Sequence, residues 1–567
     1  MNIIGVDVGN NTTKLYSLYK SNMNIIEGIS KRYIPSAISF DNVVKCRYFG
    51  DESITKIISC YNTLTNLPSK LFNYKRSLLF DKNKYLLTGQ YIYIMYINYI
   101  YNYLTSVVKT DTTMYIIPYP DYYNRTEFNT LKTSYEYSDF NTTPYYIPHS
   151  IAIGLEYGLY KSINNVFKKD TSILFIDIGH INISFYLIIF NSYSMTVERT
   201  WTLQNNGSDY LDKQLLNTVV DYIYSDPISG INTSININEK ILKKILINME
   251  PIRKNLNMFD KTTLHIDNLH NTYDLNMEIT KEDYLLLYED TIASFKTVLK
   301  IFHNNFDISH VELLGGFSRF NIFSDMITGL TGLQCKKTLN AEETLAKGCC
   351  LYGSVISPIY KNINYTIKYK YPHCICILID NDKKIFIEDE ILPLNKDIIK
   401  KYEYNRPRLS NKNISIQIYI LYEGCHQKLT TPIYNIKHKV SSLITKLSVN
   451  VIIGLDMFVK INSISYITST RTKYNITWED QPVHMKTYIR YNELLTKYDN
   501  EYKNKLKLIN TFEEYIYNID TTRKDELKKA NPGIFVELDE WLLNDVYTLD
   551  YKECINKIEY FTGNMKC

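Results

Sequence analysis

Apolar residues follow three successive patterns along the chain. Up to Pro358, short apolar runs alternate with segments of helical spacing, which is typical of α/β folds. From about residue 367 to 468, apolar and polar residues alternate, which predicts antiparallel strands. Beyond Gln481, apolar residues such as Leu495, Tyr498 and Tyr502 recur every three or four positions, which predicts helices. We therefore expect a multidomain protein ordered α/β, then β, then α.

Two stretches of the chain repeat one design. Residues 3–16 read IIGVDVGNNTTKLY, and residues 173–186 read ILFIDIGHINISFY. Each consists of a buried strand, an Asp-x-Gly turn and a second strand, which places Asp7 and Asp177 at equivalent positions. The repetition predicts a duplicated fold.

The Asp-x-Gly turns suggest phosphate chemistry. A carboxylate at the carboxyl end of a buried strand lies where α/β sheets bind ligands. Gly9 and Gly179 would permit a tight bend, and the N–H groups that follow could form a nest for phosphate oxygens. Asp7 and Asp177 would hold a magnesium ion through water. The alternative is two ordinary hairpins whose Asp caps a turn; their occurrence as a pair favours a nucleotide site.

Three later segments could complete such a site. Residues 249–257 place polar side chains at helical spacing on about one face, which is either a solvated surface or an edge that grips a base and ribose. Residues 310–320 predict a strand that ends in a Gly-Gly turn. From Leu339 a helix is expected, with Asn340 as its cap, Glu343 at its third position and small residues that pack closely.

Composition excludes several classes of function. The 567 residues include 64 basic and 60 acidic ones, a net charge of +4, so neither nucleic acid nor an anionic membrane is an expected partner. Ten Cys without metal-binding spacing favour a reducing compartment. The run from Tyr91 to Leu104 is too short to span a membrane and predicts a buried helix. With no signal-peptide pattern, a cytoplasmic location is expected.

Together, five motifs resemble the nucleotide-binding domain of the seventy-kilodalton heat-shock chaperones, a two-lobed domain of the actin-like ATPase fold. VDVGNN and FIDIGH stand where its phosphate loops stand, and EPIRKNLN and ELLGGFSRF where its adenosine-contacting segments stand. NAEETLAKG stands where its closing helix begins. The motifs occur in the family's order across residues 6–348.

The closer resemblance is to the hundred-and-ten-kilodalton class, which serves those chaperones as nucleotide exchange factors. Asn10 and Asn11 after the first glycine, and His180 after Gly179, resemble that class rather than the chaperones that hydrolyse ATP. KNINYTIKY, at 361–369, replaces the apolar-acidic linker of the hydrolysing chaperones. The resemblance implies a nucleotide-binding domain at 1–358, a linker at 359–366, a β-sandwich module at 367–468 and a C-terminal helical bundle at 469–567.

The resemblance also implies roles for individual residues. Asp7 and Asp177 would face the metal and the phosphates, and Gly207 would lie near the ribose. The phosphates would be lined by Gly9, Asn10, Asn11, Gly179 and His180. The adenosine would be held by Glu250, Arg253, Lys254, Asn257, Gly315, Gly316, Arg319 and Glu342.

Three departures from the hydrolysing chaperones predict weak or absent ATPase activity. Where they have a catalytic Lys, LPSKLFN offers Pro68 or Ser69, with Lys70 displaced by one position. His149 stands where a carboxylate bound to metal water is expected, and Asn182 replaces a phosphate-contacting Thr. Because phosphoryl transfer needs exact cation and metal placement, only Asp7 and Asp177 remain catalytic candidates.

The function implied is that of an ATP-binding co-chaperone. It would promote nucleotide exchange on a cytosolic seventy-kilodalton heat-shock chaperone, with unfolded polypeptides as secondary partners and ATP and Mg²⁺ as cofactors. One alternative is a chaperone that hydrolyses ATP and folds peptides itself. Another is an actin-like structural protein, which the β and helical modules argue against.

Overall fold

A computed structural model provides the structure of the protein. It describes most of the first 370 residues and the main helices and strands beyond them. The described residues are 1–57, 59–60, 62–80, 83–108, 112–225, 237–270, 273–360, 365–370, 374–379, 382–387, 391–393, 398–405, 413–421, 434–439, 444–453, 459–468, 473–476, 485–519, 527, 529, 531–545, 549 and 551–565.

The first sheet is built on the N-terminal hairpin. Its strand order is β11-β10-β1-β2-β3, with β4 (Ile34–Pro35) paired to β2. Strand β1 is antiparallel to β2 and parallel to β10. The strands are β1 (Asn2–Val8), β2 (Thr12–Tyr19), β3 (Asn22–Ile26), β10 (Thr113–Tyr119) and β11 (Tyr145–Pro148).

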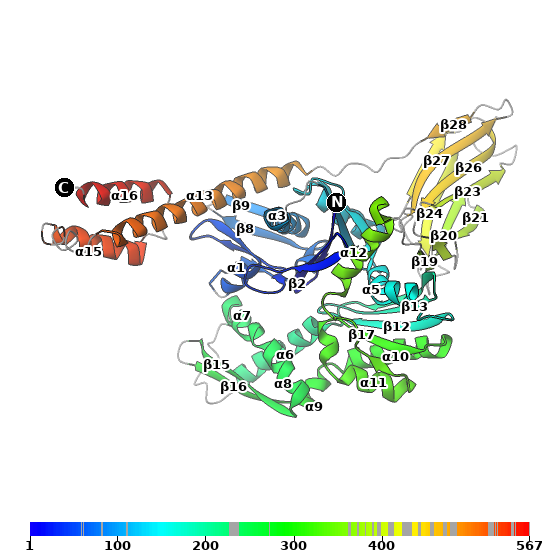
Figure 1. Ribbon diagram of the computed structural model, residues 1–567, viewed down its shortest axis with the longest axis horizontal. Helices are drawn as coiled ribbons and strands as arrows, with labels where there is room; N and C mark the ends of the chain where they lie inside the picture. Colours follow the sequence, from blue (N-terminus) through cyan, green and yellow to red (C-terminus); the bar gives the residue numbers. More distant parts are fainter. Residues whose placement is uncertain are drawn as a thin grey trace. The chain divides into compact units, whose positions relative to one another are not determined.

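A second sheet repeats the first. Its order begins β18-β17-β12-β13-β14, with the same parallel and antiparallel pairings at corresponding places. Strands β17, β12 and β13 of this sheet are labelled in Figure 1. Two strands, β19 (Thr366–Lys370) and β22 (Ile391–Pro393), extend its far edge. The predicted duplication is therefore present in the strand topology of β12 (Thr171–Ile178), β13 (Ile183–Phe190), β14 (Ser194–Leu203), β17 (His310–Leu314) and β18 (Cys335–Lys336).

Two helices, α5 (His149–Ile163) and α12 (Thr344–Ile356), pack against each other and against these sheets (Figure 1). A β-carbon on Gly348 would lie 1.9 Å from the Ala152 carbonyl oxygen, so only glycine permits this crossing. Similarly, a β-carbon on Gly5 would lie 2.1 Å from the Ala346 carbonyl oxygen. The predicted close packing of the small residues of α12 is confirmed.

The predicted start of α12 is wrong. The helix begins at Thr344, and Asn340 precedes it in a turn, where its side-chain oxygen accepts from the Glu342 N–H at 3.2 Å. Glu343 occupies the N-cap position without a side-chain capping bond. Its carboxylate takes other partners, described below.

Helices and a hairpin cover the second sheet. Their apolar side chains share one core with the inner face of β12, β13 and β17. These elements are α6 (Ser208–Ser225), α7 (Glu239–Ile247), α8 (Met249–Met258), β15 (Lys261–His270), β16 (Tyr273–Thr280), α9 (Lys281–Leu286), α10 (Glu289–Asn305), the 3-10 helix η2 (Gly316–Arg319) and α11 (Ile322–Thr331).

The contacts divide the chain into two compact units. The first contains residues 1–34 and 101–482, and the second contains residues 35–100 and 483–567. Helix α3 (Gly89–Val107) crosses this division and confirms the helix predicted over Tyr91 to Leu104. The other early elements of the second unit are β5 (Ile38–Asp41), β6 (Cys46–Phe49), α1 (Gly50–Thr55), β7 (Asn62–Leu64), α2 (Leu67–Lys70), β8 (Lys75–Phe80) and β9 (Asn83–Thr88).

Within the second unit, the long helix α13 (Lys486–Tyr517) is attached to β6 by Arg47. The backbone N–H and Nε of Arg47 each donate to the Asp499 carboxylate at 2.8 Å. Its other nitrogens donate to Asn492 Oδ1 and Thr496 Oγ1, each at 3.0 Å. Because Arg47 is only 9% exposed, these bonds are shielded from water.

The C-terminal helices share a small aromatic core. Phe512 of α13, Trp541 and Phe561 pack together with ring centroids 5.4 to 6.5 Å apart. They join α13 to α15 (Pro532–Glu540), the following π-helical turn and α16 (Tyr551–Met565). The helical spacing predicted beyond Gln481 thus corresponds to helices.

Between 374 and 476 the described strands form two four-stranded antiparallel sheets. Their orders are β21-β20-β24-β25 and β23-β26-β27-β28. The strands are β20 (Cys374–Ile379), β21 (Asp382–Ile387), β23 (Ile398–Asn405), β24 (Asn413–Leu421), β25 (Tyr434–Lys439), β26 (Ile444–Ile453), β27 (Val459–Thr468) and β28 (Lys473–Ile476).

The domain boundaries expected from the sequence stay predictions, as do the packing of the two four-stranded sheets as a sandwich and the helical bundle. Residues 361–364 of the expected linker lie outside the described residues, and 366–370 form β19.

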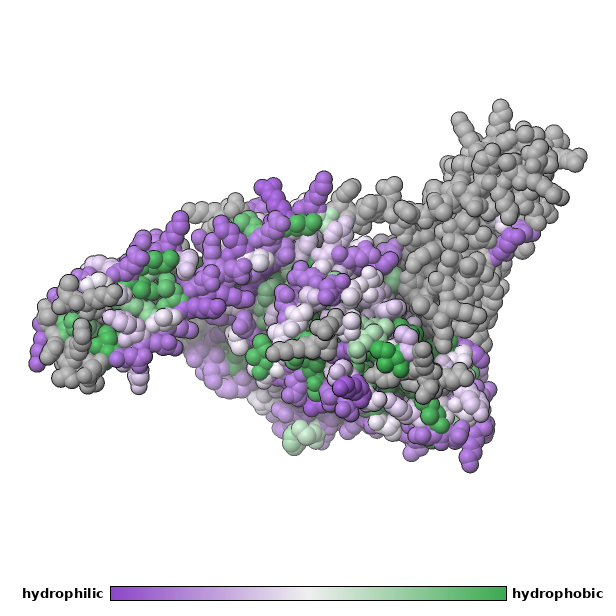
Figure 2. Space-filling view, turned by 45° about the horizontal axis from the view of Figure 1, so that its top comes forward, coloured by the Kyte–Doolittle hydropathy of each residue, from purple (hydrophilic) through white to green (hydrophobic). Residues whose placement is uncertain are grey.

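On the face seen in Figure 2, described side chains are mostly hydrophilic, with apolar ones in small groups. None of the described helices is long and apolar enough to cross a membrane.

Candidate functional site

The two aspartates of the repeated hairpins lie close enough to influence each other. Asp7 ends β1 opposite Lys14 on β2, and the Lys14 Nζ is 3.8 Å from Asp7 Oδ2. Asp177 occupies the same place on β12, where its partner on β13 is Ser184. Burial, and to a lesser extent the Asp7 charge, raise the pKa of Asp177 to about 6, while Lys14 opposes the shift. Two carboxylates and one ammonium therefore share one electrostatic environment.

The two turn glycines do not have equal roles. A β-carbon on Gly9 would lie 2.7 Å from the Thr12 carbonyl oxygen and 3.1 Å from Lys14 Nζ. On Gly179, the one described atom within 4 Å would be the Asn182 carbonyl oxygen, at 3.2 Å. Neither glycine has a positive φ. The sequence-based reason for glycine, a bend that a β-carbon opposes, therefore applies more strongly to Gly9 than to Gly179.

The second turn is held by the start of α6. His180 Nδ1 and Ser208 Oγ are 2.9 Å apart, and the His180 carbonyl accepts from the Asp209 N–H at 2.8 Å. A β-carbon on Gly207 would lie 2.4 Å from the His180 carbonyl oxygen. Gly207 is thus needed for close packing against this turn, and its place near a ribose stays a prediction.

Two histidines flank the carboxylates as neutral groups. Burial, together with the charge of Lys14, lowers the pKa of His149 at the start of α5 to about 3. Burial also lowers the pKa of His180 to about 4, although the Asp209 carboxylate opposes the shift. Asn182 bridges two loops, because its amide donates to Tyr122 Oη at 2.8 Å and its oxygen accepts from the Asn205 N–H at 2.9 Å.

This arrangement does not fit a metal ion held directly by side chains. No three His, Cys, Asp or Glu side chains of the described residues come together as metal ligands. At Asp7 the nearest counter-charge is the Lys14 ammonium, and His149 stands where a carboxylate is expected. A role for Asp7 and Asp177 toward magnesium through water stays a prediction.

The predicted polar face of α8 splits in two. Arg253 turns inward, where it pairs with Asp212 on α6, and its guanidinium carbon lies 5.9 Å from the centre of the Phe317 ring. Asn257 joins α8 to η2, because its amide donates to the Arg319 carbonyl at 3.1 Å. Glu250 and Lys254 pair with each other at 2.8 Å and are 55% and 66% exposed. Arg253 and Asn257 therefore join α8 to its neighbours, whereas Glu250 and Lys254 lie at its exposed edge, and the predicted contact of all four with adenosine stays a prediction.

Gly315 connects the second carboxylate with the Gly-Gly turn. Its φ is +81°, and a β-carbon there would lie 2.4 Å from both Asp177 Oδ1 and the Ile178 carbonyl oxygen. On Gly316, a β-carbon would meet no described atom within 4 Å. Gly315 was predicted to contact adenosine, and the structure places it directly against Asp177. Gly316 leaves open space where a ligand can approach the backbone.

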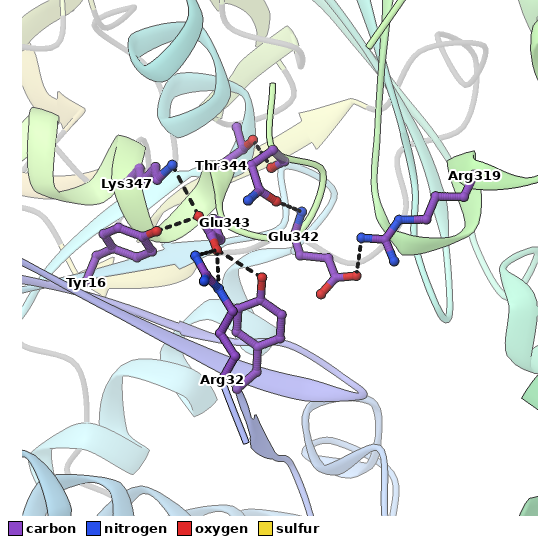
Figure 3. Close-up of polar contacts among 9 residues, drawn as sticks. Tyr16, Arg32, Arg319, Glu342, Glu343, Thr344 and Lys347 are labelled. Atoms are coloured by element: carbon purple, nitrogen blue, oxygen red, sulfur yellow. Dashed lines mark hydrogen bonds and ion pairs between the residues drawn. The ribbon is translucent and has the colours of Figure 1, made fainter. Parts of the chain in front are cut away.

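Two adjacent carboxylates at the start of α12 point to different partners (Figure 3). Glu342 pairs with Arg319 of η2, with Oε1 and the guanidinium nitrogen 2.8 Å apart. Glu343 accepts from Tyr16 Oη at 2.5 Å, from Arg32 at 2.7 and 2.9 Å and from Tyr33 Oη at 3.0 Å. A salt bridge from Lys347 Nζ to Glu343, at 3.2 Å, completes this set.

Glu343 therefore ties the first hairpin to α12. Its side chain is 2% exposed, and burial alone would favour the protonated form. The hydrogen bonds from Tyr16, Arg32 and Tyr33 outweigh burial and hold the pKa of Glu343 at about 2. Sequence reasoning missed the contacts that Glu343 and Lys14 make at the first hairpin. The register of a hairpin that turns after Asp7 is the signal that could have identified Lys14.

Comparison with known proteins decides the family. The family model described as Hsp70 protein matches residues 67–561, which is most of the chain. The chain belongs to the Hsp70 family. Its N-terminal part accordingly has an Hsp70 ATPase-like fold with mixed sheets. Hsp70 proteins in general bind ATP with Mg²⁺.

The relatives of this Hsp70-family chain include large heat-shock proteins. Heat shock protein hsp88 of Neurospora crassa is 22% identical over 65% of this chain and 57% of its own length. The 97 kDa heat shock protein of Strongylocentrotus purpuratus is 23% identical over 66% of this chain and 45% of its own length. A heat shock protein homolog of Saccharomyces cerevisiae is 23% identical over 69% of this chain and 60% of its own length.

These findings confirm the predicted family and its hundred-and-ten-kilodalton-type relatives, at low identity. The chain spans between 45% and 60% of the length of these three relatives. Individual site residues are not tested by this similarity and stay predictions.

Proposed function

We propose that this Hsp70-family chain is an ATP-binding co-chaperone that promotes nucleotide exchange on a cytosolic seventy-kilodalton heat-shock chaperone. The observation that carries the proposal is the proximity of Asp7 and Asp177 of the two Asp-x-Gly hairpins, with Gly315 of the Gly-Gly turn directly against Asp177. Two phosphate-binding turns and an open glycine backbone at one place suit a nucleoside triphosphate.

In this proposal each residue group has a definite task. N–H groups after Gly9 and Gly179 donate to phosphate oxygens, with Asn10, Asn11 and His180 beside them. Arg253, Asn257, Gly316 and the Arg319–Glu342 pair hold the adenosine, with Glu250 and Lys254 at the outer rim. Bound Mg²⁺ would supply positive charge to the phosphates and would contact Asp7 and Asp177 through water.

Hydrolysis is expected to be weak or absent. Lys70, the candidate nearest in sequence to a catalytic lysine, donates to the Thr65 carbonyl at 2.5 Å within its own unit. Burial keeps His149 neutral, because its pKa is lowered to about 3, so it cannot replace an ionised carboxylate. ATP that binds without turnover would stabilise one arrangement of the protein through its differential affinity.

The stabilised arrangement would hold a partner chaperone's nucleotide domain open and speed the release of ADP. The helices α13, α15 and α16 offer a surface for that partner, and the two four-stranded sheets offer one for unfolded polypeptides as secondary clients. The names of the relatives, all heat-shock proteins, support a chaperone role.

The test is the release of a fluorescent ADP analogue from the seventy-kilodalton chaperone of the same organism, followed by stopped flow. The chain would be compared with an Asp7→Ala/Gly9→Asp double variant, meant to abolish ATP binding, and with an exposed control, Lys169→Ala. We expect acceleration by the wild type and the control, and its loss in the double variant.

Other results would overturn the proposal. Steady-state ATP turnover by the chain alone, with no acceleration of ADP release, would indicate a chaperone that hydrolyses ATP and folds peptides itself. If the chain showed neither ATP turnover nor acceleration of ADP release, a holding or structural role on a shared fold would remain.

A further inference from the structure

Lys14 places a positive charge beside the first phosphate-binding turn. It lies on β2, directly opposite Asp7, and its side chain is only 14% exposed. Its Nζ is 3.1 Å from the point where a β-carbon on Gly9 would be, so the ammonium lies against the turn itself. A ligand oxygen bound against Gly9 would therefore also lie near Lys14.

The same charge reaches the rest of the site. Lys14 opposes the raised pKa of both Asp7 and Asp177, and it helps to lower the pKa of His149. These three groups come from β1, β12 and the start of α5. The ammonium therefore lies among the elements that meet at the two hairpins.

The second hairpin supplies no equivalent cation at the matching position. Its residue opposite Asp177 is Ser184, whose hydroxyl is 3.0 Å from Thr202 Oγ1. One lysine thus faces two carboxylates, and the three groups together carry a net negative charge when ionised. A triphosphate adds further negative charge, which must be neutralised where the hairpins meet.

The ammonium has the capacity to bind phosphate. Its 3.8 Å separation from Asp7 Oδ2 is longer than a direct hydrogen bond. An ammonium carries three donors, and a lysine near phosphate acts as a compact point charge. A short movement along the flexible stem would allow contact with a phosphate oxygen while Asp7 remains a neighbour.

We propose that Lys14 is a phosphate-binding residue for nucleoside di- and triphosphates. The inference rests on the proposed function, because it concerns the same nucleotide site. It predicts that removing the Lys14 ammonium weakens nucleotide binding both with and without Mg²⁺.

The test is the equilibrium binding of a fluorescent ATP analogue to the full chain, in excess Mg²⁺ and in excess EDTA. The two buffers show whether an effect of Lys14 depends on the metal. Lys14→Met should lose about tenfold to a hundredfold in either buffer, the range for a lost hydrogen bond between charged groups. Lys14→Arg keeps the charge and should stay closer to the wild type.

A matched control is Lys132→Met, which removes a lysine of α4 (Arg125–Glu136) that pairs with Glu136. It should bind like the wild type. Circular dichroism and thermal unfolding of each variant would identify any that fails to fold. If Lys14→Met does not fold, Lys14→Arg is the variant whose binding is compared with that of the wild type.

The outcomes separate the two proposals. Binding in Mg²⁺ that is unchanged in Lys14→Met overturns the role of Lys14 and leaves ATP binding intact. A wild-type chain that binds no nucleotide in either buffer overturns the proposed function as well. Loss in Lys14→Met with retention in Lys14→Arg, in both buffers, supports the inference.

Discussion

The two Asp-x-Gly hairpins share their backbone design and differ in how each is completed. β1–β2 and β12–β13 occupy the same place in two sheets whose first five strands have corresponding orders. Opposite the aspartate, the first hairpin carries Lys14 and the second carries Ser184. The second turn is packed by Gly207 and Gly315, whereas the nearest atoms to Gly9 belong to its own hairpin. The two hairpins thus share a backbone geometry but differ in their surroundings. A lysine lies opposite the first aspartate, whereas two glycines pack closely against the second turn.

The largest expected effect comes from disturbing the packing of the second hairpin. Gly315→Ala should lower the free energy of unfolding by about 2–4 kcal/mol, because it combines a positive φ with a clash against Asp177 and Ile178. Its matched control is Gly316→Ala, where a β-carbon meets no described atom. Urea unfolding, monitored by intrinsic fluorescence, measures the free energy of unfolding of both variants. Equal shifts in the two variants would contradict the assigned packing.

The histidines beside the two hairpins predict a loss of stability in acid. In the folded protein, burial lowers the pKa of His149 to about 3 and that of His180 to about 4. As the pH falls below 6.5, these two histidines therefore bind protons in the unfolded chain before they do so in the folded protein, which favours unfolding. Each histidine should therefore cost about 2 kcal/mol of stability between pH 7 and pH 5.

His149→Gln and His180→Gln should each flatten this pH profile by about that amount. Urea unfolding at several pH values checks it, with the exposed His303→Gln as the control. A profile unchanged by either substitution would show that these histidines take up protons in the folded state as readily as in the unfolded state.

The smallest effect compares the two turn glycines directly. Gly9→Ala should cost about 1–2 kcal/mol, because its β-carbon would press on the Thr12 carbonyl oxygen at 2.7 Å. Gly179→Ala should cost less than about 1 kcal/mol, since its one described neighbour is 3.2 Å away. The same unfolding measurement applies. A larger cost at Gly179 would reverse the difference drawn between the hairpins.

Local sequence patterns predicted the elements that depend on local chemistry. Both hairpins, α8, β17 and the buried helix over Tyr91 to Leu104 appear where their patterns place them. The glycine and aspartate motifs also identified the family, because they keep their order over a long stretch of chain. Backbone geometry at these turns is set by neighbouring residues, so it can be read from short segments.

Features set by distant contacts were not predicted. The expected Asn340 cap and the third-position role of Glu343 are wrong, because the Glu343 carboxylate is occupied by Tyr16, 327 residues away, and by Arg32 and Tyr33. The inward position of Arg253 on α8, where it pairs with Asp212, was not predicted either. A single sequence contains no local signal for such partners.

The attachment of Arg47 to α13 has a consequence for synthesis on the ribosome. Arg47 and Asp499 are separated by 452 positions, so the strand emerges long before the helix that covers it. At translation rates of about 5–20 residues per second, that delay is roughly 20–90 s. During this time the side of the early segment that carries Tyr85 and Tyr91 is not yet covered by Tyr491 and Tyr488 of α13. While it is being synthesised, this proposed co-chaperone would thus itself expose an uncovered surface to chaperones.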